Sequence, residues 1–198
     1  AISRRQRQMC IRDSNTAAPI ICRPFDHGAA IIIHSTTKYI GGHGTSIGGI
    51  IVDAGGFDWA GAGDRQPALN TPDPSYHGAV FSQLPDPSTP LAFILKARTT
   101  LLRDMGGAMS PFNAFQFIQG LETLPLRIRE HSKNANEIAN FLSSHEKVTN
   151  VIYPGLMEGD YKKRADAHLS GGYGGLVGFE LAGGVDSGKK LSLIHISE

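Results

Sequence analysis

A lysine preceded by hydroxyl side chains is the part of the sequence best suited to chemistry. Ser35, Thr36 and Thr37 come directly before Lys38, and Gly41–Gly44 follows closely. A partly desolvated lysine amine has a lowered pKa and can attack a carbonyl. Hydroxyls can donate hydrogen bonds to a phosphate, and glycines let the backbone approach a flat ring. The segment therefore matches the needs of a pyridoxal phosphate (PLP) site, although a lysine after a strand is more often a solvated surface residue.

Two apolar strands are expected to position this segment. Residues 29–34 form a short, β-branched run that predicts a buried parallel strand ending before Ser35. Residues 47–53 predict a second buried strand after the glycines. Residues 61–90 are rich in Gly, Pro, Asp and Ser and predict a long loop. Such loops in compact domains are usually functional or part of an interface.

Helical periodicity follows the long loop. It predicts a helix over residues 92–105 and another that starts at Ser110-Pro111, with the serine as N-cap and the proline at the first helical position. Pro125 is expected to interrupt that helix and to mark a domain joint. The apolar face of the interrupted helix is predicted to hold Phe112, Phe115, Ile118 and Leu121. A further helix over 126–144 and strands over 148–153 and 176–181 complete an α/β class with a second α+β portion.

Composition excludes several classes of protein. The 198 residues carry a formal net charge of +1 and contain two cysteines, which are too few for a disulfide framework. No apolar run approaches the roughly 18 residues of a membrane span, so we expect no membrane partner and a cytoplasmic location. Four arginines lie within the first 14 residues. The rest of the chain therefore has no excess of basic residues that could form a face for nucleic acid. His27, His34 and His43 lack acidic or cysteine partners at ligand spacing, so no metal site is expected.

The segment from His34 to Gly44 resembles the cofactor-attachment signature of the Cys/Met-metabolism PLP-dependent enzymes, the group of cystathionine synthases and lyases. The similarity covers nearly all of residues 15–190. Stretches that are similar to the O-acetylhomoserine sulfhydrylase branch in particular lie at 45–53, 57–59, 73–78 and 102–124. The long loop at 61–90 is also similar to that branch, because the lyases carry a shorter link there.

The resemblance implies a PLP-dependent transferase of fold type I. The chain would comprise part of the large domain, which has a mostly parallel sheet with flanking helices. Part of an α+β carboxy-terminal domain would follow. The cofactor would be pyridoxal 5'-phosphate, with Lys38 as the imine-forming lysine and Ser35 and Thr37 holding the phosphate. Lys38 would also remove the Cα proton of the substrate and shuttle protons between carbons.

The resemblance also implies a reaction and partners. The reaction would be γ-replacement on O-acetylhomoserine by sulfide or methanethiol, which gives homocysteine or methionine plus acetate. Members of the family are typically homotetramers whose sites form across a dimer interface, and the long loop would help to form that interface. The partners would therefore be a small amino acid, sulfide or a thiol, and further copies of the chain.

The ends of the sequence differ from the rest. Residues 1–14 and 191–198 resemble translated sequencing adapters, so we expect non-native tails there. The expected domains are then 15–122, the second half of the cofactor-binding domain, and 123–190, the first part of the small domain. On this interpretation the chain is a fragment.

Two positions depart from the family pattern. The family aspartate that pairs with the pyridine nitrogen falls on Asp13 in an ungapped comparison, and on Ser14 when Asn15-Thr16 is matched by identity. Ala30 stands where the family usually has an acidic residue. The amino-terminal phosphate-binding arm, the ring-stacking tyrosine and the arginine for the substrate carboxylate have no counterpart in this sequence.

Three alternatives stay open. A cystathionine γ-synthase, or a methionine or cystathionine γ-lyase, would share Lys38 but should lack the loop at 73–78. A lysine Schiff-base enzyme without PLP would not need Ser35 and Thr37. An incomplete chain would turn over no substrate by itself.

Overall fold

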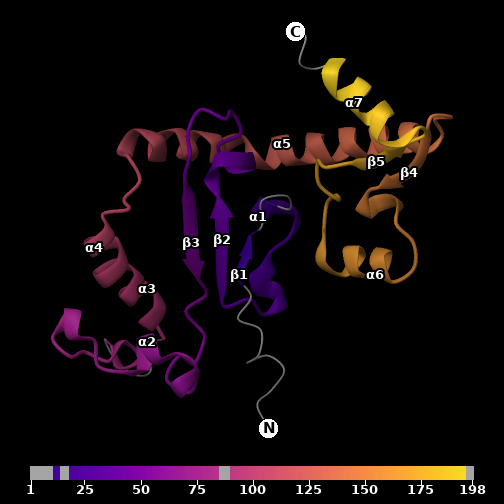
Figure 1. Cartoon of the computed structure of the whole chain (residues 1–198). Coiled ribbons are helices and arrows are strands. Elements are labelled where there is room, and N and C mark those ends of the chain that lie inside the picture. Colours follow the sequence, from indigo (N-terminus) through magenta and orange to yellow (C-terminus); the bar gives the residue numbers. More distant parts are fainter. Residues whose placement is uncertain (1–10, 14–17, 85–89, 195–198) are drawn as a thin grey trace. The chain divides into compact units, whose positions relative to one another are not determined.

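The structure is a computed structural model that describes residues 11–13, 18–84 and 90–194. The chain divides into two compact units (Figure 1). Unit 1 comprises Ala1–Ser14 and Pro24–Gln119, and unit 2 comprises Asn15–Arg23 and Gly120–Glu198. None of the helices in the described part of the chain has both the length and the apolar character of a membrane span.

Unit 1 contains a three-stranded sheet in the order β1-β2-β3 (Figure 1). β1 (Ile11–Asp13) pairs in parallel with β2 (Ile31–Ser35), and β2 pairs antiparallel with β3 (Gly49–Asp53). The strand predicted at residues 29–34 is therefore confirmed, shifted slightly toward the lysine. Because β1 and β2 run in the same direction, their carboxyl ends meet at one edge of the sheet.

Short helices occupy much of the region that the sequence predicts as a long loop. They are the 3-10 turns Gly63–Arg65, Pro74–Tyr76 and Phe81–Gln83, together with α2 (Pro67–Asn70). The Asn70 amide donates to the carbonyls of Trp59 and Gln66, both at 3.0 Å, and so ties these turns together. The region is thus ordered by its own hydrogen bonds in its described part.

The remaining helical segments of unit 1 follow this region. α3 (Ala92–Lys96), a wider turn at Ala97–Leu102 and α4 (Arg103–Met105) together confirm the helix predicted over 92–105. A further 3-10 turn, Pro24–His27, precedes β2. The core of the unit packs β2 against the segments that follow β3, with Ala30, Ile31, Trp59, Leu69, Phe81 and Ala92 buried.

Unit 2 combines a strand pair with helices. β4 (Val148–Ile152) pairs antiparallel with β5 (Gly178–Leu181). The helical elements are α1 (Ala18–Ile21), the 3-10 turn Pro154–Leu156, α6 (Gly159–His168), α7 (Gly184–Ile194) and the later part of α5 (Pro111–Ser143). Its core includes Ala135, Ala139 and Tyr153, and the Tyr153 hydroxyl lies 3.2 Å from the carbonyls of Ser132 and Gly174.

Pro125 does not interrupt the helix, so the predicted division into two helices is wrong. α5 runs from Pro111 through Pro125 to Ser143. Leu124 and Ile128 are both buried on either side of the proline, and this packing favours the continuous helix over the local preference of proline. An Arg127 guanidinium N–H also donates to the Gly120 carbonyl at 2.7 Å, in a side-chain hydrogen bond that spans the proline.

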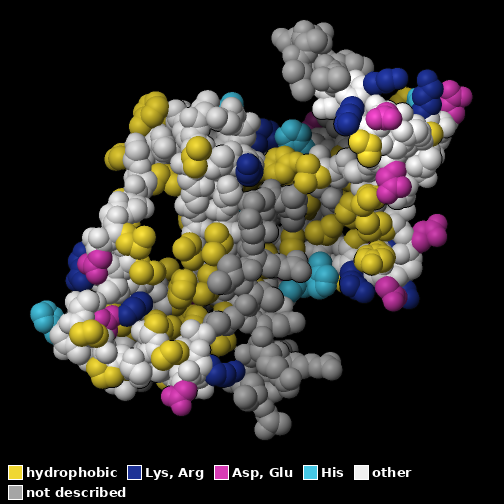
Figure 2. Space-filling model, in the orientation of Figure 1, with side chains coloured by type: hydrophobic (Ala, Val, Ile, Leu, Met, Phe, Trp, Pro, Cys, Tyr) yellow, Lys and Arg dark blue, Asp and Glu magenta, His cyan; other side chains and the backbone are white. Residues whose placement is uncertain are grey.

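The apolar faces expected to be buried are partly open. Ile50 and Ile51 of β3 are 48% and 45% exposed, contrary to the predicted buried strand. The predicted apolar face of α5 is exposed at each of its members, Phe112, Phe115, Ile118 and Leu121. Hydrophobic side chains also lie open between β3 and the α3–α4 segment on the face shown in Figure 2. The expected burial of β3 is thus wrong for Ile50 and Ile51, and no element of the described chain covers these apolar residues of β3 and α5.

Candidate lysine and phosphate site

Lys38 lies in a single wide helical turn, Thr36–Ile40, that follows β2 directly. Its backbone departs from helical geometry, with φ −89° and ψ −124°. The turn is closed by hydrogen bonds from Gly41 N to Thr36 O and from Gly42 N to Lys38 O, both 2.8 Å long. The Lys38 side chain is exposed. The fold therefore presents this amine at the carboxyl end of β2.

The three hydroxyl residues before Lys38 have different surroundings. Thr36 is buried, and its Oγ1 has no hydrogen-bond partner among the described residues. Ser35 and Thr37 are half-buried. Thr37 Oγ1 accepts from Gly48 N at 3.0 Å and donates to Gly48 O at 3.2 Å. Ser35 and Thr37, which are predicted to hold a phosphate, are thus partly accessible to solvent, whereas Thr36 between them is buried.

The same sheet edge also carries Asp13. This residue ends β1 and pairs in register with Ile33, two residues before β2 ends at Ser35. Neighbouring strands lie about 4.8 Å apart, so the Asp13 backbone is one strand away from the lysine turn. Open α/β sheets bind ligands at the carboxyl ends of their strands. The alternative position, Ser14, lies outside the described residues.

A glycine-rich loop, residues 41–48, connects the lysine turn to β3. Gly42 and Gly44 have φ values of 79° and 67°, which favour glycine. Thr45 Oγ1 donates to Gln116 Oε1 at 3.1 Å, and the Ser46 hydroxyl donates to the same oxygen. Gln116 was not predicted from the sequence, where its one signal is a polar side chain between two phenylalanines of α5.

These residues fit pyridoxal phosphate by the chemistry of their groups. An exposed amine and two half-buried hydroxyls lie within four residues at the end of a strand. The Thr37 proton, held by Gly48 O in this structure, can turn to a phosphate oxygen while Thr37 Oγ1 still accepts from Gly48 N. Among the described residues, no group of three or more His, Cys, Asp or Glu side chains could hold a metal ion.

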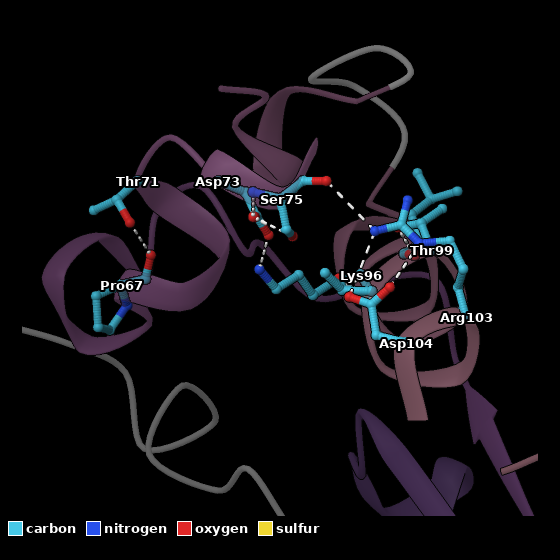
Figure 3. Close-up of polar contacts among 10 residues, drawn as sticks. Pro67, Thr71, Asp73, Ser75, Lys96, Thr99, Arg103 and Asp104 are labelled. Carbon is cyan, nitrogen blue, oxygen red and sulfur yellow. Dashed lines mark hydrogen bonds and ion pairs between the residues drawn. The ribbon is translucent and has the colours of Figure 1, made fainter. Parts of the chain in front are cut away.

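The loop at 73–78 is anchored by a second polar cluster (Figure 3). Asp73 is 6% exposed and accepts hydrogen bonds from the Lys96 ammonium and from Ser75 Oγ at 2.6 Å. The hydrogen bond from Lys96, followed by that from Ser75, lowers the pKa of Asp73 to about 2. Arg103 donates to Ser75 O at 3.4 Å and pairs with Asp104. The loop is therefore held on α3 and α4.

Comparisons with known proteins identify the family of the chain. The profile of the family "Cys/Met metabolism PLP-dependent enzyme" matches residues 1–197. The chain is 48% identical over 184 residues to the O-acetyl-L-homoserine sulfhydrylase of Leptospira meyeri, covering 90% of the chain and 41% of that protein. It is 47% identical over 171 residues to the homocysteine synthase of Schizosaccharomyces pombe, covering 86% and 39%.

A solved structure shows the same fold. A crystal structure from Campylobacter jejuni, assigned as an O-acetylhomoserine (thiol)-lyase and carrying N'-pyridoxyl-lysine-5'-monophosphate, matches with a TM-score of 0.80 and 37% identity. The match covers 91% of this chain and 46% of that one, and it confirms fold type I. The chain spans about two fifths of the length of the curated relatives named above. By its sequence, its fold and its lysine turn, the chain belongs to the Cys/Met metabolism PLP-dependent enzymes.

Proposed function

We propose that this chain carries the lysine-bearing part of an enzyme that replaces the γ-acetoxy group of O-acetylhomoserine by sulfide or methanethiol. The products are homocysteine or methionine, plus acetate. The observation that carries the proposal is that the exposed Lys38 lies within four residues of the half-buried Ser35 and Thr37 at the carboxyl end of β2. The substrate assignment is supported by relatives named as an O-acetyl-L-homoserine sulfhydrylase and a homocysteine synthase.

Each residue of the site has a distinct role in this proposal. Bound pyridoxal phosphate supplies an electron sink for charge that develops at the substrate Cα. The hydroxyls of Ser35 and Thr37 hold the phosphate, and Asp13 is the candidate partner of the pyridine nitrogen. Lys38 Nζ accepts the Cα proton and delivers protons to neighbouring carbons, since its flexible side chain is exposed beside the site.

The proposal extends to assembly and location. We place the protein in the cytoplasm, as expected for an amino-acid biosynthetic enzyme without a membrane partner. We also propose that the complete protein is a homotetramer. The open apolar residues of β3 and α5 support burial against further polypeptide, because monomers rarely expose such faces.

The first test is cofactor attachment to Lys38. The chain is incubated with pyridoxal phosphate, reduced with borohydride and digested, and the pyridoxyl group is located by mass spectrometry. We expect the label on Lys38 and its loss in Lys38→Ala. Lys163→Ala is the matched control, because Lys163 is an exposed lysine of α6 whose ammonium lies 3.7 Å from Asp160. A chain of native helical content that leaves Lys38 unlabelled would contradict the proposal.

The second test separates the reaction classes. O-acetylhomoserine is supplied with sulfide, methanethiol or cysteine in turn, to the complete protein reconstituted with the cofactor. Homocysteine or methionine supports the proposal. Cystathionine formed from cysteine would instead indicate a γ-synthase, and a keto acid with ammonia in the absence of any thiol would indicate a γ-lyase.

A further inference from the structure

Gln116 joins helix α5 to the glycine-rich loop that follows the lysine. Its Oε1 accepts hydrogen bonds from two consecutive hydroxyls, Thr45 Oγ1 at 3.1 Å and the Ser46 Oγ. Ser46 is buried, and its Oγ also lies 3.5 Å from Asn113 Oδ1, one turn earlier on α5. The residues Thr45, Ser46 and Gln116 are called the amide latch below. All of them belong to unit 1.

The loop needs such an anchor because its backbone is intrinsically permissive. The loop contains four glycines. Gly41, Gly42 and Gly44 precede Thr45, and Gly48 lies two residues after Ser46. Glycine has the largest backbone freedom of any residue, so ordering this segment carries a high entropic cost. The latch provides the side-chain hydrogen bonds between the loop and a regular helix.

Contacts on both sides of the latch lead to the proposed site. Two residues after Ser46, the Gly48 backbone makes both hydrogen bonds with the Thr37 hydroxyl. On the other side, Gly42 N donates to the carbonyl of Lys38 at 2.8 Å. Movement of the loop would therefore move the backbone hydrogen bonds that hold Thr37 and Lys38.

We propose that Gln116 is a positioning residue for the lysine and phosphate site, acting through Thr45 and Ser46. The inference rests on the function proposed above, which gives Thr37 and Lys38 their roles. Gln116 itself touches neither residue in the described structure. Its role is to hold the glycine-rich loop so that the Thr37 hydroxyl and the Lys38 backbone keep their places.

Two variants remove the latch from opposite sides. Gln116→Leu removes the acceptor and keeps most of the side-chain volume, whereas the double change Thr45→Val with Ser46→Ala removes both donors. Gln116→Glu keeps the acceptor oxygens and is the rescuing variant. Gln119→Leu is the matched control, since Gln119 is an exposed glutamine on the next turn of the same helix.

The first readout is hydrogen–deuterium exchange of a peptide covering residues 41–48, measured without cofactor. Neutral hydrogen bonds of this kind predict roughly tenfold faster exchange in Gln116→Leu and in the double variant. Gln116→Glu and Gln119→Leu should exchange as the wild type does. Unchanged exchange in both latch variants would overturn the inference, whatever the fate of the cofactor.

The second readout is the rate at which pyridoxal phosphate labels Lys38, trapped with borohydride. We expect a several-fold lower rate in both latch variants and a normal rate in Gln116→Glu and Gln119→Leu. Faster loop exchange with an unchanged labelling rate would overturn the positioning role. If the wild-type chain itself is never labelled at Lys38, the proposed function fails, and the exchange experiment still decides whether the latch holds the loop.

Discussion

The Thr37 hydroxyl and the Gly48 backbone hold each other through two hydrogen bonds, at 3.0 and 3.2 Å, across eleven residues of sequence. This pairing closes the glycine-rich loop at its far end and fixes the residue directly before Lys38. Gly48 O also accepts from Thr36 N at 3.0 Å. The loop therefore returns to the sheet beside the point at which it left, and β3 begins there in register with β2.

Loss of the Thr37 hydroxyl should destabilise the chain. Thr37→Val leaves Gly48 N–H without its acceptor, and we expect a decrease of about 1–2 kcal/mol in the free energy of unfolding. Urea denaturation followed by circular dichroism measures it. The same variant should bind pyridoxal phosphate more weakly. Unaltered stability and unaltered binding together would contradict the role assigned to Thr37.

The neighbouring threonine should behave in the opposite way. Thr36 is 5% exposed, and its Oγ1 has no hydrogen-bond partner in the part of the chain that the structure describes, so this polar atom is buried at a cost in free energy. We expect Thr36→Val to leave stability unchanged or to raise it by up to about 1 kcal/mol. The same denaturation experiment compares the two variants. A loss in Thr36→Val as large as that in Thr37→Val would show that the Thr36 hydroxyl is paired in solution.

Gly48 should not tolerate a side chain. A Cβ there would lie 2.6 Å from Met109 Cε and from Phe117 Cε2, so the loop or α5 would have to shift. We expect Gly48→Ala to lower the free energy of unfolding by about 1–3 kcal/mol. Gly107→Ala is the control, because a Cβ at Gly107 meets no atom within 4 Å. Equal melting temperatures for the two variants would argue against this packing.

The contribution of Asp73 should depend on pH. Its pKa is about 2 in the folded chain, below the ordinary value of 3.8, chiefly because of the hydrogen bond from Lys96. A lowered pKa stabilises the fold above pH 3.8, and this stabilisation is lost as the pH falls toward 2. Asp73→Asn should therefore melt at a lower temperature than the wild type at neutral pH.

The difference between Asp73→Asn and the wild type should shrink between pH 4 and pH 2, as measured by thermal denaturation at several pH values. Asp64→Asn serves as the control, since Asp64 is exposed in the same unit. A difference that stays constant over this range would exclude Asp73 as the titrating group.

Unit 2 offers a prediction that is independent of the site. The buried Tyr153 hydroxyl lies 3.2 Å from two backbone carbonyls, and burial raises its pKa. Tyr153→Phe should lower the free energy of unfolding by roughly 1 kcal/mol. Tyr161→Phe, on the exposed surface of α6, should have no effect in the same denaturant titration. Equal stabilities of the two variants would indicate that water replaces the lost hydroxyl.

Local pattern was sufficient to predict the surroundings of Lys38. The β-branched run before Ser35 and the glycines after Ile40 predict a strand and a flexible stretch through local preferences alone, whereas the wide turn Thr36–Ile40 was not predicted. Gln116 could not be found this way, because its partner Ser46 lies 70 residues earlier in the chain. A hydrogen bond at that separation leaves no periodic signal in the sequence.

Two other differences have separate physical causes. Because proline disfavours a helix interior, Pro125 was expected to break the helix. Burial of Leu124 and Ile128 instead keeps α5 continuous. The exposure of Ile50 and Ile51 was missed because a continuous apolar run shows that its side chains favour burial and does not show what covers them. The first difference concerns packing around α5, and the second concerns what covers an apolar strand.

The open side of β3 has a practical consequence for handling the protein. In the described sheet β3 is a terminal strand, and it displays the isoleucines Ile50 and Ile51 toward solvent. A free strand border with β-branched residues can template pairing between molecules. This polypeptide should therefore associate through intermolecular sheets as its concentration rises, and Ile51→Lys should reduce that association in a light-scattering measurement.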